Sequence, residues 1–178
     1  KRKEDGINKI KNMNINIDHL FTLQELQELG TTTSKTEVFK NIYINSFTNR
    51  FIQIVQQKQS NIVLSPDFTN TNEILNIVNT CGPHICGVKL HLDIIADFTQ
   101  QFMIQLKNLS HKYNFIIIED RKFADIGNTI EKQLTNPHYN MIEYVDAVTT
   151  HSVSGSNIFD VFKKHNIPVI VIQDMSSS

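Results

Sequence analysis

Apolar and polar positions follow two different patterns along the part of the chain that begins at residue 61. Short runs rich in Val, Ile and Phe are typical of buried strands, and they alternate with stretches whose apolar residues recur at helical spacing. We predict strands at residues 61–65, 85–90, 115–120, 146–151 and 168–172. We predict helices at residues 71–80, 98–113, 126–134, 139–145 and 156–165.

Strands that alternate with helices predict a parallel sheet covered by helices. An open doubly wound sheet and an incomplete (β/α)8 barrel share this order of elements. No Gly-rich dinucleotide-binding or P-loop fingerprint follows the first predicted strand, which disfavours the open nucleotide-binding sheet. The predicted fold class is therefore α/β, as a partial (β/α)8 TIM barrel with about five of its parallel strands.

The beginning of the chain, residues 1–34, has weak patterning, and we expect a tail or linker there. Thr22 and Glu25 can form a capping box for a short helix, which Gly30 would end. A longer helical pattern then leads into the first strand, with apolar residues Phe39, Ile42, Tyr43, Phe47, Phe51, Ile54 and Val55. The sequence thus predicts a tail at 1–34 and one globular domain at 35–178.

Composition narrows the range of partners. The chain has 178 residues, 40% of them hydrophobic and 20% charged, with a net charge of -1. This balance gives no electrostatic reason to expect nucleic acid or a membrane as a partner, and no apolar run approaches the ~20 residues of a membrane span. Cys81 and Cys86 are the cysteines, so we expect two buried thiols in a reducing, cytoplasmic setting. The histidines show no metal-site spacing.

Polar side chains lie at or just after the carboxyl end of every predicted strand, where active sites of parallel α/β proteins gather. They are Ser65, Asp67, Lys89, His91, Asp93, Asp120, Lys122, His151, Ser152, Gln173 and Asp174. Because residues two apart in a strand share a face, Asp120 and Lys122 should point the same way, with Arg121 turned away. Lys89, His91 and Asp93 would also share a face if the extended backbone continues that far.

Opposite charges that gather at a strand end have to pair, because an isolated buried charge costs several kcal/mol or more. Two interpretations of this cluster remain open from spacing alone. It is an active site, or it is a salt-bridged rim of the barrel without chemistry.

The stretch EDRKFADIGNT, residues 119–129, resembles the signature of the orotidine 5'-phosphate decarboxylase family, in the form found in the decarboxylase domain of bifunctional UMP synthase. LSPD (64–67), GPHICGVKLHLDI (82–94) and DMSSS (174–178) follow in the family's order and spacing. The resemblance covers roughly residues 35–178. It implies a (β/α)8 barrel that acts as a homodimer and converts orotidine 5'-phosphate to UMP in pyrimidine biosynthesis, without a metal or organic cofactor. The family continues for about three more βα units, so we expect a truncated portion that is inactive alone.

The resemblance also implies roles for individual residues. Lys122 matches the lysine that protonates C6 of the pyrimidine, and Asp120 matches the carboxylate beside the substrate carboxylate. Asp125 and Thr129 match residues that cross into the partner subunit's site. The implied catalytic array is Lys89, Asp120, Lys122 and Asp125, and the substrate-binding candidates are Asp67, Lys89, His91, Thr129 and either Ser176 or Ser177. For His91, a purely structural hydrogen bond is the alternative.

Three further possibilities concern the protein as a whole. Residues 1–34 resemble the end of an upstream phosphoribosyltransferase domain and the linker of a fused enzyme. The pattern Asp-x-Lys-x-x-Asp also occurs in metal-dependent phosphosugar decarboxylases of a related barrel family. A requirement for Mg²⁺ would distinguish such an enzyme from an orotidine 5'-phosphate decarboxylase. Without phosphate-binding units, the chain is alternatively a non-catalytic remnant that serves as an oligomerisation or binding module.

Overall fold

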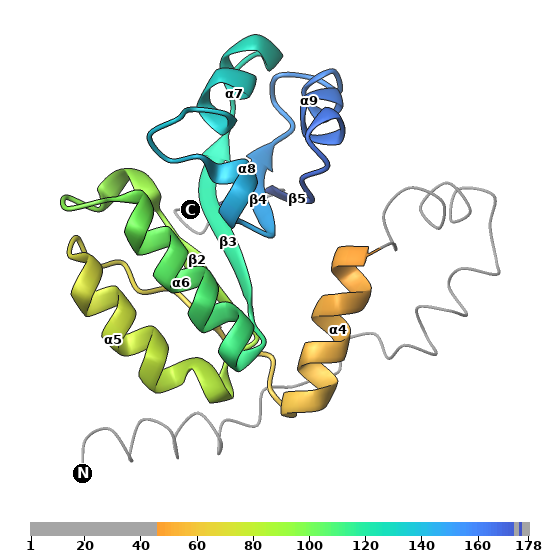
Figure 1. Ribbon diagram of the computed structural model, residues 1–178. Coiled ribbons are helices and arrows are strands. Elements are labelled where there is room, and N and C mark those ends of the chain that lie inside the picture. The colour runs from red at the N-terminus through yellow and green to blue at the C-terminus, as the bar shows by residue number, and fades with distance from the viewer. Residues whose placement is uncertain (1–45, 173–174, 176–178) are drawn as a thin grey trace, which may run out of the picture. The chain divides into compact units, whose positions relative to one another are not determined.

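The structure is a computed structural model that describes residues 46–172 and Met175 (Figure 1). These residues belong to one unit, Ser46–Ser178. The predicted helix at residues 22–29, the first part of the helix predicted from residue 39 and the boundary expected between residues 34 and 35 lie outside the described residues.

The described strands form one sheet in the order β1-β2-β3-β4-β5. Their bounds are β1 Val63–Leu64, β2 Gly87–Leu90, β3 Ile116–Phe123, β4 Ala147–His151 and β5 Val169–Ile172. Every neighbouring pair is parallel. Each strand lies beside the one before it in sequence, as in a section of a barrel, whereas a doubly wound sheet reverses its order at a switch point. The predicted α/β fold with five parallel strands is confirmed.

Helices connect the strands, and side chains cap several of them. The bounds are α4 Ser46–Lys58, α5 Thr71–Cys81, α6 Gln100–Tyr113, α7 Gly127–Leu134, α8 Met141–Tyr144 and α9 Ile158–Lys164, with 3-10 turns at η2 Gly82–His84 and η3 Leu92–Ile94. The side chain of Asn70 accepts two backbone amides at the start of α5, and Thr99 accepts one at the start of α6. Asn114, in the left-handed conformation, ends α6.

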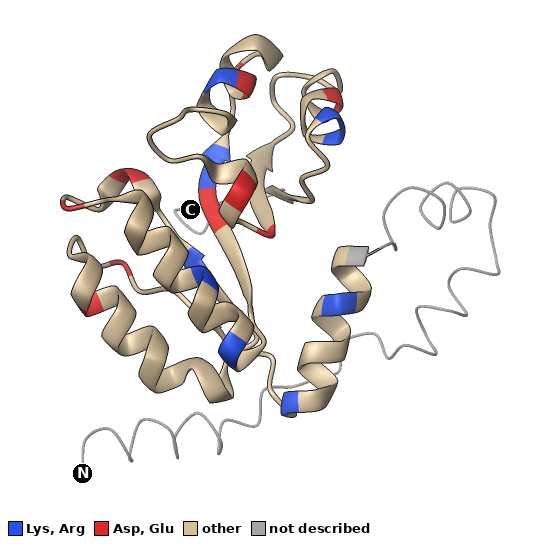
Figure 2. Cartoon of the chain, in the orientation of Figure 1, with Lys and Arg blue, Asp and Glu red and all other residues tan. Residues whose placement is uncertain are grey.

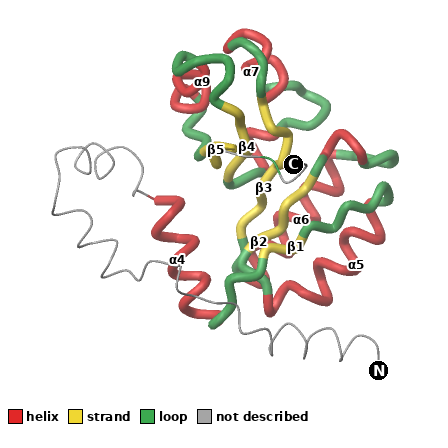
Figure 3. Tube along the Cα trace, turned by 180° about the vertical axis from the view of Figure 1, so that it is seen from behind, coloured by secondary structure: helices red, strands yellow, loops and turns green. Residues whose placement is uncertain are grey.

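Different helices cover the two faces of the sheet. Val88 of β2 and Ile117 of β3 belong to a core shared with α5, α6, α7 and α9. Ile116 and Ile118, which alternate with Ile117, pack against Ile54 of α4. Figures 1 and 3 show α4 on the opposite side of β2 and β3 from α5 and α6. The second face is therefore covered at the amino ends of the strands, and its carboxyl ends carry the site described below.

The chain leaves the extended conformation earlier after β2 than the alternation of polar residues suggested. β2 ends at Leu90, and His91 then precedes the 3-10 turn η3. This turn carries Asp93 away from Lys89 to the guanidinium of Arg121, where the Asp93 Oδ2 to Arg121 Nη1 distance is 3.5 Å. The condition for a common face of Lys89, His91 and Asp93, an extended backbone as far as Asp93, is therefore not met.

The two cysteines differ in burial. Cys86 is buried as predicted, whereas Cys81 is only half-buried, so the prediction of two buried thiols is wrong for Cys81. Neither forms a disulfide. Among the described residues, none of the helices has the length and hydropathy to cross a membrane.

Candidate active site

The carboxyl end of β3 contains an irregularity that aims two side chains. The register between β3 and β4 shifts between Glu119 and Phe123, and Lys122 has a left-handed backbone with φ of 52°. Such bulges change the direction of side chains and are frequent next to active sites. β3 continues to Phe123 instead of ending at residue 120 as predicted. Figure 2 shows the acidic and basic segments that adjoin along this part of β3.

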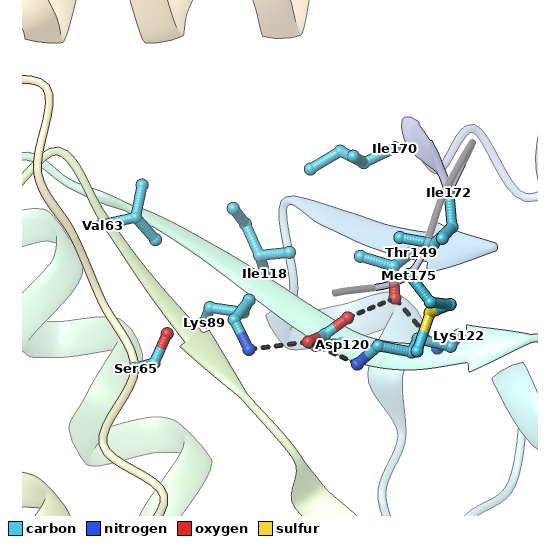
Figure 4. A pocket seen from close by; sticks show the side chains of 10 residues that line it. All are labelled: Val63, Ser65, Lys89, Ile118, Asp120, Lys122, Thr149, Ile170, Ile172 and Met175. Atoms are coloured by element: carbon cyan, nitrogen blue, oxygen red, sulfur yellow. Dashed lines mark hydrogen bonds and ion pairs between the residues drawn. The ribbon is translucent and has the colours of Figure 1, made fainter. Parts of the chain in front are cut away.

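A pocket of about 480 Å³ opens at this edge of the sheet. Its volume is within the range of roughly 300–1,000 Å³ that is usual for small-molecule sites. Residues of all five strands, or residues just after them, line it: Val63, Ser65, Lys89, Ile118, Asp120, Lys122, Thr149, Ile170, Ile172 and Met175 (Figure 4). Asp120 and Lys122 share this pocket while Arg121 pairs with Asp93, so the predicted alternation at 120–122 is confirmed.

Asp120 is the centre of the charged cluster. Its Oδ2 accepts hydrogen bonds from Lys89 Nζ at 2.6 Å and from Lys122 Nζ at 2.7 Å. His91 Nε2 lies 3.4 Å from the same oxygen. The side chain of Asp120 is 7% exposed, whereas those of Lys89 and Lys122 are 28% and 30% exposed. A buried carboxylate thus holds two ammonium groups at the wall of the pocket.

The charge on Asp120 follows from these contacts. Burial alone would raise the pKa of Asp120, but hydrogen bonds from Lys122, Lys89 and Thr149 outweigh it and lower the pKa to about 2. Asp120 is therefore a carboxylate at neutral pH.

Thr149 of β4 is a site residue that the sequence analysis missed. Its hydroxyl donates to Asp120 Oδ1 at 2.8 Å and accepts the backbone N–H of Lys122 at 2.9 Å. Thr149 is 4% exposed. It therefore fixes both the carboxylate of Asp120 and the left-handed backbone of Lys122. Its position two residues before the polar strand end at His151 was the available signal, but threonine is common in strands generally.

Several predicted site residues do not line the pocket. Asp67 is exposed in the loop after β1. Asp125 is exposed, and its Oδ1 accepts the amide of the next residue at 2.7 Å. Thr129 is half-buried on α7. Ser176 and Ser177 lie outside the described residues.

The site offers positive charge and a proton donor to an anionic ligand. The carboxylate of Asp120 is occupied by two ammonium groups and a hydroxyl. Within the described part of the chain, no three or more His, Cys, Asp or Glu side chains come together as metal ligands would. The exposed sides of Lys89 and Lys122 are thus the groups that can meet a ligand in the pocket.

The fold and the site together define a section of a (β/α)8 barrel with a lysine–aspartate–lysine cluster at the carboxyl ends of its strands. Residues 60–178 match the model of the Orotidine 5'-phosphate decarboxylase / HUMPS family. The chain belongs to this family, as its signature stretch predicted.

Individual relatives agree with this assignment. The chain is 43% identical over 116 residues to orotidine 5'-phosphate decarboxylase of Pichia kudriavzevii, across 65% of this chain and 44% of that protein. It is 35% identical over 133 residues to uridine 5'-monophosphate synthase of Bos taurus, across 72% of this chain and 28% of that protein. The solved orotidine 5'-monophosphate decarboxylase of Methanocaldococcus jannaschii has a TM-score of 0.54 and 25% identity, over 66% of this chain and 56% of that one. The chain spans less than half of the length of either of these two curated relatives.

Proposed function

We propose that this chain supplies the lysine–aspartate part of the active site of an orotidine 5'-phosphate decarboxylase, which forms UMP and CO2. The observation that carries the proposal is the carboxylate of Asp120, held between the ammonium groups of Lys89 and Lys122. Membership in the family supports the same reaction class.

Lys122 is the proposed proton donor. In the reaction, the bond between C6 and the substrate carboxylate breaks, CO2 leaves, and the electron pair stays on C6. The Lys122 ammonium at the pocket wall would stabilise this developing charge and then give its proton to C6. Solvent would return a proton to the Lys122 amine.

Asp120 supports this chemistry in two ways. Its carboxylate is ionised at neutral pH, and at 2.7 Å it stabilises the ammonium form of Lys122. A substrate carboxylate bound beside Asp120 would be repelled, and the repulsion would be relieved when CO2 leaves. Lys89 and Asp67 would hold the ribose, with His91 and either Ser176 or Ser177 as further substrate contacts.

The test is Lys122→Ala in a form of the protein that contains the whole barrel. We expect UMP formation to fall by at least about a thousandfold, because proton transfer and charge stabilisation are both lost. Lys163→Ala is the matched control, since Lys163 is 55% exposed on α9 and pairs with Asp160 away from the pocket. Circular dichroism should show that both variants fold.

Other outcomes would select the alternative functions. Near-normal turnover by folded Lys122→Ala would contradict the proposed role of Lys122. Activity that appears only with added Mg²⁺ would indicate a metal-dependent phosphosugar decarboxylase. A folded whole-barrel protein that forms no UMP would indicate a non-catalytic oligomerisation or binding module.

We further propose a homodimer in which Asp125 and Thr129 enter the site of the partner subunit. Both residues lie outside the pocket of their own chain, and Ile126 between them is 64% exposed. An exposed apolar residue next to an exposed carboxylate suits a two-fold interface that also delivers a charge.

Mixing two inactive variants tests the shared site. A dimer of one Lys122→Ala subunit and one Asp125→Ala subunit has one site with both residues intact, so we expect activity to return to about half of that of the wild-type dimer per mixed dimer. Lys122→Ala mixed with Lys89→Ala is the matched control, because each site then keeps one defect. Mixed dimers that form without any return of activity would contradict the cross-subunit role of Asp125.

Residues 1–34 are proposed as the end of an upstream phosphoribosyltransferase domain, with residues 35–178 as the first part of the decarboxylase barrel. One of the similar proteins is a uridine 5'-monophosphate synthase, which is the basis for proposing a fused enzyme.

A further inference from the structure

β3 presents a second carboxyl group that the proposed chemistry does not use. Asp120 and Lys122 line the pocket, whereas Glu119 lies between β3 and the turn η3. Glu119 is completely buried, with 0% exposure. Acidic side chains are rarely buried without a compensating contact, so the burial of Glu119 indicates that its carboxyl group has a structural or functional role.

Among the described residues, a backbone amide is the hydrogen-bond donor to the carboxyl group of Glu119. Leu92 N–H donates to Glu119 Oε1 at 3.3 Å and to Oε2 at 3.1 Å. Leu92 is the first residue of η3, and Asp93 in the same turn pairs with Arg121. Two residues of β3 therefore hold the turn that follows β2.

The position of the turn η3 determines where the side chain of His91 lies. His91 immediately precedes Leu92, and its Nε2 is 3.4 Å from Asp120 Oδ2 in the pocket wall. The bond from Leu92 N–H to Glu119 fixes the peptide that joins His91 to the turn. A shift of that peptide would move the imidazole away from Asp120.

We propose that Glu119 is a positioning residue of this site, which anchors the Leu92 amide and thereby directs the His91 imidazole toward Asp120. Its consequence for catalysis rests on the proposed decarboxylase function, whereas its consequence for His91 does not.

The ionisation of Glu119 supports this role. The pKa of Glu119 is raised to about 8, and burial is the largest cause. The charges of Asp93 and Asp120 also raise the pKa, whereas the hydrogen bond from the Leu92 amide and the charge of Arg121 lower it. Those three charged groups, one on η3 and two on β3, are the ones that act on Glu119. Near neutral pH the group is mostly an uncharged acid, which can accept the amide without placing a second negative charge behind Asp120.

The first test follows the imidazole of His91 by NMR in the 178-residue chain, with Glu119→Gln and Glu119→Leu. Glu119→Gln keeps an oxygen for the Leu92 amide, so we expect the His91 signals of the wild type at neutral pH, without the step near pH 8 that ionisation of Glu119 produces. Glu119→Leu removes the acceptor, so the His91 signals should move toward those of an exposed histidine. His165, which lies 3.0 Å from Glu131 at the end of α9, is the internal control and should not change.

Unchanged His91 signals in folded Glu119→Leu would overturn the proposal. If Glu119→Leu does not fold, Glu119→Gln decides, because this variant keeps an acceptor for the Leu92 amide, and His91 signals that move toward those of an exposed histidine in it at neutral pH would also overturn the proposal.

The second test measures UMP formation by the whole-barrel protein. Glu119→Leu should lower kcat/KM about tenfold, as loss of one hydrogen bond in a buried network would, and Glu119→Gln should rescue most of that loss. Equal losses in both variants would contradict positioning through the amide. Absence of activity in the wild type would refute the proposed function instead, and the NMR result would still stand.

Discussion

Lys122, the proposed proton donor, has an unfavourable backbone conformation. Its φ of 52° is in the left-handed region, which costs an L-residue roughly 1–2 kcal/mol. The Thr149 hydroxyl accepts its N–H at 2.9 Å, and the side-chain ammonium binds Asp120. Neighbouring residues thus hold Lys122 in a conformation that its own chemistry does not favour, which is common at functional sites.

Glycine substitution tests this strain. The free energy of unfolding should be about 1 kcal/mol higher for Lys122→Gly than for Lys122→Ala, because glycine adopts a positive φ without a penalty. Lys89 is the matched control, since it binds the same carboxylate from the regular strand β2. There, Ala should be more stable than Gly. Urea unfolding of the four variants measures both differences, and a Gly variant less stable than Ala at residue 122 would contradict the strain.

Side-chain alternation was enough to predict that Asp120 and Lys122 share a face, because the period of two holds through the bulge. It could not predict the left-handed Lys122, since lysine carries no sequence signal for that conformation. Thr149 was missed for a related reason, because a threonine on a buried strand usually only packs. Its role depends on the register of β4 against β3, which the sequence does not contain.

At the scale of the elements, Asp146, the residue just before β4, joins two helices to a strand. Asp146 Oδ1 accepts from Arg50 of α4 at 2.8 Å and from Lys107 of α6 at 3.1 Å, and its Oδ2 accepts the Ile117 amide of β3 at 2.7 Å. The side chain of Asp146 is 10% exposed. It therefore links helices on both faces of the sheet to the strand that carries the site.

Removing this carboxylate should destabilise the chain strongly. We expect Asp146→Ala to lower the free energy of unfolding by about 3 kcal/mol, because two cations and a buried amide lose their acceptor. Asp160→Ala is the control, since that side chain is 75% exposed and forms one pair along α9. Its effect should be below about 0.5 kcal/mol. Equal shifts of the urea unfolding curve in both variants would contradict the linking role of Asp146.

The sequence predicted which helices and strands are present better than it predicted the residues at which they begin and end. The runs of β-branched residues located all five strands because each run is short, apolar and bounded by polar or turn residues. The short turns η2 and η3 were not predicted, since three residues are too few to show a period. That omission misplaced Asp93, which lies on η3, and it concealed the connection from Glu119 through Leu92 to His91.

For the whole molecule, the outer strands of the described sheet are the most exposed. β1 and β5 each pair on one side within the described residues. Val63 on β1 is 36% exposed, and Ile170 and Val171 on β5 are 38% and 46% exposed. Exposed edges of this kind favour pairing with further strands. Among the described residues that line the pocket, the side chains of Lys89 and Lys122 are 28% and 30% exposed, so water reaches them.

The 178-residue chain alone should not decarboxylate orotidine 5'-phosphate measurably. Among the described pocket residues, Lys89 and Lys122 are the cations, and both are already paired with Asp120, so the described pocket offers no cation dedicated to the phosphate. Charge-assisted bonds to a phosphate contribute roughly 1.5–3 kcal/mol each, and about 1.4 kcal/mol changes binding tenfold. Water in the open pocket would also weaken the fields of the charged groups.

A UMP-formation assay on the purified, folded chain measures this, with the same chain carrying Lys122→Ala as the blank. Turnover above the blank would show that these residues suffice for catalysis or that a second copy supplies the rest.

The cluster around Asp120 has one more consequence, because two ammonium groups face a single carboxylate. Among the described residues that line it, each pocket thus has a surplus of one positive charge, apart from His91. If Asp125 of the partner subunit completes the site, its negative charge cancels that surplus. Assembly of the dimer would then be driven partly by long-range attraction, which is screened over about 10 Å at 0.1 M salt. Ionic strength would therefore change the rate at which two chains associate, and the charges of the proposed active site would contribute to association as well as to the reaction.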